Sequence, residues 1–222
     1  MIKKRTEAVA VTGMIAVVAL AVSLAIGQTG KQDTAGKPTS DQGEPKLPAG
    51  CSEEDMKAFV EAGTPGKMHA FPADQVGVWE GKSQMWMGPA ATEPATGTCT
   101  WTVKPLMDGR FIHCELTGEL PGMGPFTGLG LTGYDNVSQK FVGSWLDNHN
   151  TGIMQGVGEI SKDGKRIDWK YNYNCPITKK PAVVRQVDHY SSADTWSFDA
   201  FTIDPKSGEE FKCMHVDFTR TR

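Results

Sequence analysis

From Val76 to the C-terminus, apolar and polar residues alternate with a period of two, and turn signals interrupt the pattern at short intervals. The clearest stretch is 167–174, where Ile, Trp, Tyr and Tyr alternate with Asp, Lys, Asn and Asn. Such alternation is typical of a β-strand with one buried and one polar face. Turn dipeptides such as Asp108-Gly109 and Asp163-Gly164 separate the stretches. The sequence therefore predicts an all-β domain of short strands.

About ten strands fit between these turns. We expect them near residues 76–87, 97–105, 110–118, 126–135, 140–147, 153–160, 165–174, 183–191, 195–203 and 209–219. Short links make consecutive strands antiparallel neighbours, and closing the sheet on itself removes its unpaired edges. We therefore predict a closed antiparallel meander barrel of about ten strands.

The N-terminus carries a targeting signal. A positive start, Lys3-Lys4-Arg5, precedes an uncharged apolar stretch over residues 8–27. This stretch is long enough to cross a membrane as a helix, but it also ends in Ala25-Ile26-Gly27, which resembles a signal-peptide cleavage site. Residues 1–27 are thus a membrane anchor or a signal peptide cleaved near Gly27. In both cases the barrel is exported to the periplasm or cell envelope, held at the inner membrane or secreted.

Residues 28–50 have the polar, Gly- and Pro-containing composition of a flexible linker. A folded domain is expected over 51–222, beginning with a short amphipathic helix at about 52–62 that Ser52 caps and Gly63 ends. We expect this helix to pack against the barrel. Lipidation of Cys51 is disfavoured because that cysteine follows the apolar stretch by more than twenty residues.

Charge argues against nucleic acid as a partner. The chain has a net charge of −3, and its first 27 residues carry +2, so the remainder carries −5. A mildly acidic domain without a basic stripe does not attract a phosphate backbone.

The first strand contains the motif Gly77-Val78-Trp79, and Arg220 stands near the end of the last strand. The lipocalin-like barrels carry this Gly-x-Trp motif, with the Trp closing one end of the barrel and an Arg from the last strand lying over its ring. The resemblance implies a structural role for Trp79 and Arg220, and cation–π stacking supplies the physical reason.

Longer segments extend the resemblance over about residues 52 to 220. They are AGTPGKMH (62–69), LMDGRF (106–111), GMGPFTGLG (122–130), GYDN (133–136), WLDN (145–148), TGIM (151–154), RQV (185–187) and FKCM (211–214). With these segments the chain resembles the bacterial family known as domain of unknown function 1579. The resemblance implies a lipocalin-like barrel and no established activity. His149, Cys175, Cys213 and His215 depart from the family pattern.

A closed barrel of this size can leave an interior cavity that binds a small apolar or amphipathic molecule. The alternative is an interior packed solid with side chains. Our candidate cavity lining is Trp79, Trp101, Arg110, His113, Tyr134, Trp145, Asp147, His149 and Met154. Ligand binding is the leading hypothesis for the function, and no cofactor is expected.

Three other functions remain open. An isomerase or hydrolase would use His113 or His149 beside a carboxylate in the cavity, although we expect a binding protein rather than an enzyme. A haem protein, as in the similar nitrobindin barrels, would need His189 or His215 to point inward. A structural or interaction module of the cell envelope would have a filled barrel and an exposed apolar patch.

The cysteines and histidines predict neither a metal site nor a disulfide. Cys213 and His215 are spaced to share a strand face, but a third and a fourth metal ligand are not visible. A turn at Asp108-Gly109 pairs Cys99 with Gly118 and Val103 with Cys114. This register leaves Cys99 and Cys114 two residue pairs apart on one face, too far to bond.

Overall fold

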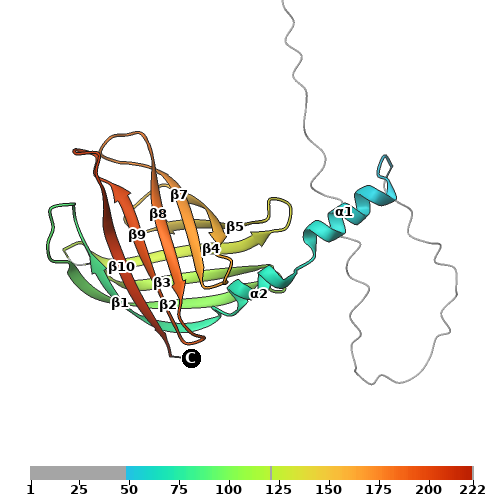
Figure 1. The fold of residues 1–222 in the computed structure, drawn as a ribbon, viewed down its shortest axis with the longest axis horizontal. Helices are drawn as coiled ribbons and strands as arrows, with labels where there is room; N and C mark the ends of the chain where they lie inside the picture. Colours follow the sequence, from blue (N-terminus) through green and yellow to red (C-terminus); the bar gives the residue numbers. More distant parts are fainter. Residues whose placement is uncertain (1–48, 121, 222) are drawn as a thin grey trace, which may run out of the picture. The chain divides into compact units, whose positions relative to one another are not determined.

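The computed structural model describes residues 49–120 and 122–221 as two helices followed by ten strands (Figure 1). The strands are β1 (Gly77–Met85), β2 (Ala95–Leu106), β3 (Phe111–Leu120), β4 (Gly124–Asp135), β5 (Lys140–Asp147), β6 (Met154–Ile160), β7 (Arg166–Asn174), β8 (Pro181–Tyr190), β9 (Thr195–Ile203) and β10 (Glu210–Arg220). Each strand pairs with its neighbours in sequence, and β1 also pairs with β10. The predicted closed antiparallel meander of ten strands is confirmed.

The pairing of residues between neighbouring strands shows which side chains lie beside each other in the barrel wall. Trp79 in β1 lies opposite Trp101 in β2 on one side and opposite Arg220 in β10 on the other. The predicted pairs of Cys99 with Gly118 and of Val103 with Cys114 are both present. The register expected from a turn at Asp108-Gly109 is therefore confirmed.

Two helices precede the barrel, where we expected one. The first, α1 (Glu53–Gly63), is the predicted helix, and the Ser52 hydroxyl accepts a hydrogen bond from the Asp55 N–H at its start. The expectation that α1 packs on the barrel was wrong, because none of its residues is buried. Its tie to the barrel domain is polar: the Asn136 amide donates to the carbonyls of Glu61, Ala62 and Thr64.

The second helix, α2 (Lys67–Ala73), was not predicted and lies against one end of the barrel (Figure 1). Phe71 packs edge-on against Tyr190, with ring centroids 4.7 Å apart, and lies tilted against Phe141, with ring centroids 5.8 Å apart. His69 is buried, accepts a hydrogen bond from the Gly66 N–H at 2.9 Å, and packs on Tyr134. Helix α2 thus closes the end of the barrel at which β1 begins and β10 ends.

Large aromatic rings fill much of the barrel interior, and glycines on neighbouring strands leave room for them. A Cβ added to Gly128 would collide with the Trp145 indole, and one added to Gly156 would collide with the Tyr171 ring. Because interiors are close-packed, such a collision cannot be absorbed without moving the ring. The glycines therefore determine where the rings stand inside the barrel.

Two predictions fall outside the described residues: the anchor or signal peptide at 1–27 and most of the flexible linker at 28–50. Within residues 49–120 and 122–221, no helix combines the length and the apolar character needed to cross a membrane.

Candidate functional site

The barrel interior contains a cavity of about 360 Å³. Its lining is predominantly apolar and comes from all ten strands and from α2. The volume falls within the range of about 300–1,000 Å³ typical of ligand pockets. The barrel is therefore not packed solid, and its interior is the candidate functional site.

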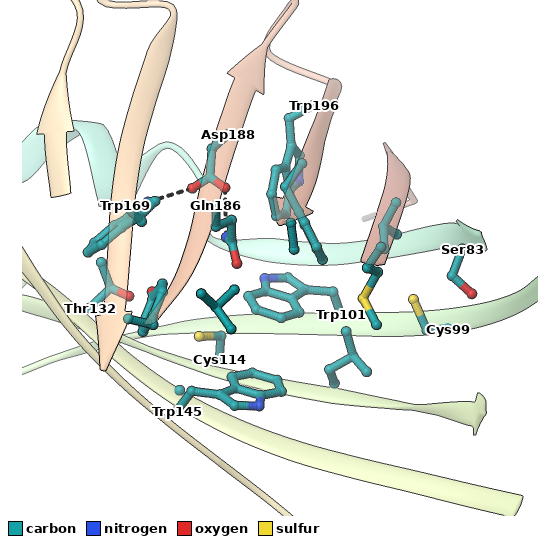
Figure 2. A pocket seen from close by; sticks show the side chains of 18 of the residues that line it. Ser83, Cys99, Trp101, Cys114, Thr132, Trp145, Trp169, Gln186, Asp188 and Trp196 are labelled. Atoms are coloured by element: carbon teal, nitrogen blue, oxygen red, sulfur yellow. Dashed lines mark hydrogen bonds between the residues drawn. The ribbon is translucent and has the colours of Figure 1, made fainter. Parts of the chain in front are cut away.

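One buried carboxyl group lies in this apolar lining. Asp188 in β8 is only 5% exposed and accepts hydrogen bonds from Trp169 Nε1 at 2.8 Å and from Gln186 Nε2 at 2.7 Å. The Tyr190 hydroxyl donates a third bond at 3.3 Å. Figure 2 shows Trp169 and Gln186 converging on Asp188, with the Gln186 carbonyl oxygen directed into the cavity. Because these donors stabilise a buried acceptor, the network fixes a polar point near the closed end.

Burial raises the pKa of Asp188 to about 6, against the hydrogen bonds from Gln186, Trp169 and Tyr190, which act to lower it. The two nearby phenols, Tyr171 and Tyr190, have a pKa raised by burial and by the charge of Asp188. Both phenols are therefore neutral at physiological pH, and Asp188 is the group of this network that titrates near neutrality.

The acidic side chains of the lining are not matched by basic ones. Besides Asp188, two carboxylates line the cavity, Glu119 and Asp147, both at strand ends on the open side of the barrel. Among the described lining residues there is no Lys, Arg or His. The cavity is consequently an apolar tube with acidic groups at both ends.

Three thiols also line the cavity. Burial raises the pKa of Cys99 and Cys213 to about 11 and that of Cys114 to about 12. These groups are protonated at neutral pH, and a thiol is a far weaker nucleophile than a thiolate. All five cysteines lie in the part of the chain that the structure describes, and all are free. The cavity cysteines thus act as small apolar side chains.

A ladder of aromatic rings leads from the interior to the open end. Trp101 stacks on Trp145 with ring centroids 5.8 Å apart and an interplanar angle of 6°. Phe126 stacks on Trp145 at 6.4 Å, and His149 stacks on Phe126 at 5.8 Å. The ladder offers flat apolar faces along one wall of the cavity.

Four of the nine predicted lining residues do line the cavity: Trp101, Trp145, Asp147 and Met154. Asp147 also accepts hydrogen bonds from Trp145 Nε1 at 3.2 Å and from the backbone N–H of His149 at 2.9 Å. Trp145, Asp147 and Met154 therefore lie together on the neighbouring strands β5 and β6, and Trp101 in β2 joins them by stacking on Trp145.

The other five lie elsewhere. Trp79 is 1% exposed at the closed end, with the Arg220 guanidinium 4.0 Å above its ring centroid. Tyr134 packs under α2, and Arg110 donates to the Gly63 and Met107 carbonyls outside the barrel. His113 alternates with the inward-facing Ile112 and Cys114 and so faces outward.

His149, the fifth, is exposed at the rim of the open end, where its Nε2 lies 3.2 Å from the Pro125 carbonyl.

The interactions of Trp79 and Arg220 are those expected of the Gly-x-Trp motif. Arg220 also donates to the carbonyls of Val76 at 2.6 Å, Asp74 at 2.7 Å and Ala193 at 2.9 Å.

The haem hypothesis required His189 or His215 to point inward. Both lie on the outer face, where His215 Nδ1 is 2.9 Å and His189 Nε2 is 3.8 Å from the Asp199 carboxylate.

The shared face predicted for Cys213 and His215 was wrong. A β-bulge between Lys212 and Met214 changes the alternation, so that Cys213 lines the cavity and His215 does not. Within the described part, no three His, Cys, Asp or Glu side chains are grouped to hold a metal ion.

Sequence reasoning missed Asp188 and Gln186. Both stand in the alternating pattern of β8, where Val184, Gln186, Asp188 and Tyr190 all line the cavity. The period of two was visible, but it did not reveal which face was inward, because Gln and Asp are ordinarily outward residues.

Comparison with known proteins agrees with this architecture. The family model described as "Protein of unknown function (DUF1579)" matches residues 64–220. The chain belongs to this family. The predicted resemblance is confirmed, and the DUF1579 barrel is lipocalin-like in fold. No curated protein matches the chain by sequence.

Solved structures similar to this DUF1579 member share its fold at low sequence identity. Rv2717c from M. tuberculosis has a TM-score of 0.51 at 12% identity, covering 72% of this chain and 100% of that one. The S-type phycobiliprotein lyase CPES from Guillardia theta also has a TM-score of 0.51, at 10% identity, covering 74% of this chain and 97% of that one. At such identities the likeness shows the fold alone.

Proposed function

We propose that the DUF1579 barrel binds a small apolar or amphipathic molecule in its interior. The observation that carries this proposal is the apolar cavity of about 360 Å³ with a hydrogen-bonded carboxyl group, Asp188, in its lining. Binding sites for small molecules combine these features: mostly apolar walls and a few polar groups that fix orientation.

The cavity can hold a molecule of moderate size. A cavity of about 150 Å³ in another protein binds benzene, and this one is more than twice as large. The lining therefore suits two or three fused rings, or an acyl or alkyl chain of medium length. The stacked faces of Trp101 and Trp145 supply contact surface for either.

Binding is better supported than catalysis. An enzyme of the kind considered from the sequence needs a histidine and a carboxylate together in the cavity. Among the described residues, the histidine closest to a carboxylate oxygen is His215, beside Asp199 on the outer face. The cavity thiols have raised pKa values and are not activated nucleophiles.

We also propose, from the N-terminal segment, that the barrel works outside the cytoplasm.

Titration of the full chain with the neutral fluorescent probe N-phenyl-1-naphthylamine tests the proposal. We expect saturable binding of one probe per chain, because the probe fluoresces when it leaves water. In Ala200→Phe, an inward residue of β9 is enlarged, and probe binding should fall at least about tenfold as the cavity fills.

The matched control is Ser197→Phe, which adds a ring to the outer face of the same strand. It should bind like the wild type. Equal binding by Ala200→Phe and the wild type, or no saturable binding by the wild type, would place the probe outside the barrel or leave it unbound, and the proposal would fail.

A further inference from the structure

We propose that the ligand of this cavity is a lipophilic amine or other organic cation, whose charged nitrogen pairs with Asp188 while its apolar body occupies the barrel. This inference rests on the proposed binding function and adds the charge class of the ligand. Four features of the described residues support it.

The first feature is the sign of the charges. Every ionised side chain of the described lining is a carboxylate: Asp188 near the closed end, and Glu119 and Asp147 near the open end. A fatty acid, or any other anion, would enter without a Lys, Arg or His to pair with it. Burying an unpaired charge beside like charges is strongly unfavourable. The lining therefore selects against anions.

The second feature is the unused acceptor capacity of Asp188. An ionised carboxylate offers about four lone-pair directions. Three donors occupy them, from Trp169, Gln186 and Tyr190. One direction remains for a ligand, and a charge-assisted N–H···O bond is among the strongest available in a protein. The three existing bonds hold the carboxylate in place for it.

The third feature is the presence of free oxygen acceptors in the lining besides Asp188. The Gln186 carbonyl oxygen points into the cavity (Figure 2). Gln75, which also lines the cavity, has a buried side-chain oxygen without a hydrogen-bond partner. The lining also holds a buried donor without a partner, the Trp196 indole N–H. A ligand nitrogen with several N–H groups fits such a surrounding.

The fourth feature is the aromatic wall. Trp101 and Trp145 present stacked indole faces to the cavity between its two acidic ends. Indole faces attract cations, most strongly where water is excluded. A cation entering past Glu119 and Asp147 would therefore meet carboxylates at both ends of its path and aromatic rings between them, whereas an anion would meet no positively charged side chain among the described lining residues.

Three probes with the same alkyl chain test the inference: n-decylamine, 1-decanol and decanoate, titrated by calorimetry into the full chain at pH 7.5. The amine is protonated at this pH, as lysine is, and the acid is ionised. We expect decylamine to bind at least about tenfold more tightly than decanol, and decanol more tightly than decanoate.

The variant Asp188→Asn should lower the affinity for decylamine to about that for decanol and leave decanol nearly unchanged. Asp217→Asn is the matched control, because it removes the same charge from an exposed position on the outer face of β10. It should keep the preference of the wild type. The ranking in the wild type tests the inference even if Asp188→Asn does not fold.

The outcomes separate the inference from the proposed function. If decanoate binds as tightly as decylamine, or if Asp188→Asn folds and keeps the preference for the amine, the charge assignment is overturned while the binding function stands. If none of the three probes and no N-phenyl-1-naphthylamine binds, the binding function itself fails, and the inference fails with it.

Discussion

Arg220 makes more contacts than cation–π stacking alone requires. Its guanidinium lies over Trp79 and donates to three backbone carbonyls, two of them in the segment between α2 and β1 and one between β8 and β9. A planar fork of five N–H groups can satisfy all of these acceptors together. The side chain thus joins the first strand, the last strand and the closed end.

Arg220→Lys should therefore lower the free energy of unfolding by about 2 kcal/mol, because an ammonium group cannot bond all three carbonyls at once. Urea denaturation monitored by circular dichroism measures this. Arg166→Lys is the control: its partner Asp168 is on the outer face, and both side chains are about half exposed, so the change should stay within about 0.5 kcal/mol. Equal effects of the two substitutions would contradict the role given to Arg220.

Asp188 should make stability depend on pH. Its pKa in the folded state, about 6, lies above the value of about 3.9 for an unfolded aspartate. The folded state therefore binds the proton more tightly. The resulting stabilisation is complete below pH 4 and is lost as the pH rises to about 6, by up to about 3 kcal/mol.

Comparing Asp188→Asn with the wild type isolates this effect. The variant cannot ionise, so its stability relative to the wild type should increase from pH 4 to pH 7, measured by urea denaturation at each pH. Tyr171, Tyr190 and Cys114 face the same cavity with raised pKa values and do not titrate in this interval. A difference that does not change with pH would show that Asp188 is not desolvated in the fold.

The cavity thiols should resist modification. Cys99, Cys114 and Cys213 combine burial with a raised pKa, whereas Cys51 is partly exposed ahead of α1. Brief treatment of the folded protein with iodoacetamide at pH 7.5 should label Cys51 and leave these three at least about tenfold less modified. Mass spectrometry of the resulting peptides measures each site. Similar labelling of all four would mean that the cavity is open to solvent.

At the scale of the element, the inner glycines should be intolerant of a methyl group. Gly128→Ala in β4 would push the Trp145 ring out of place, and we expect a loss of about 1–3 kcal/mol in unfolding free energy with a changed tryptophan fluorescence spectrum. Gly152→Ala, between β5 and β6, meets no atom within 4 Å and should change stability by less than about 0.5 kcal/mol. Equal stability of the two variants would contradict the packing described.

The strands were predictable because alternation and turn signals agree along the whole barrel. The predicted 140–147 and 195–203 coincide with β5 and β9, and the pairing of β2 with β3 followed from Asp108-Gly109. Helix α2 was not predictable in the same way. It has seven residues, follows Gly66 and contains Pro72, so it shows breakers rather than a helical period.

The bulge in β10 shows a second limit. Counting by two from His215 places Cys213 on the same face, but one unpaired residue between Lys212 and Met214 changes the alternation. Nothing in the local sequence marks this position, because the bulge arises in the pairing of two strands. The face of the sheet on which a residue lies can therefore be predicted by counting only along a stretch of strand without a bulge.

At the scale of the whole molecule, the size and the chemistry of the cavity depend on all the side chains that point into the barrel. Alternation, turn signals and short links predicted a closed barrel, and four of the nine candidate lining residues, Trp101, Trp145, Asp147 and Met154, line its cavity. The carboxyl network could not be predicted, because Asp188, Gln186 and Trp169 come together only when β7 and β8 pair with their inner faces on one side. Whether space remains after the rings pack is likewise a property of the entire barrel.

Native mass spectrometry of the full chain, purified from cells without denaturant, would detect a ligand held in the barrel. We expect one small molecule per chain, apolar with a basic nitrogen, that is absent from Ala200→Phe and present in Ser197→Phe. If the wild type carries no ligand and still gains none after incubation with decylamine, decanol or N-phenyl-1-naphthylamine, the barrel does not bind such molecules, and the proposed function is wrong.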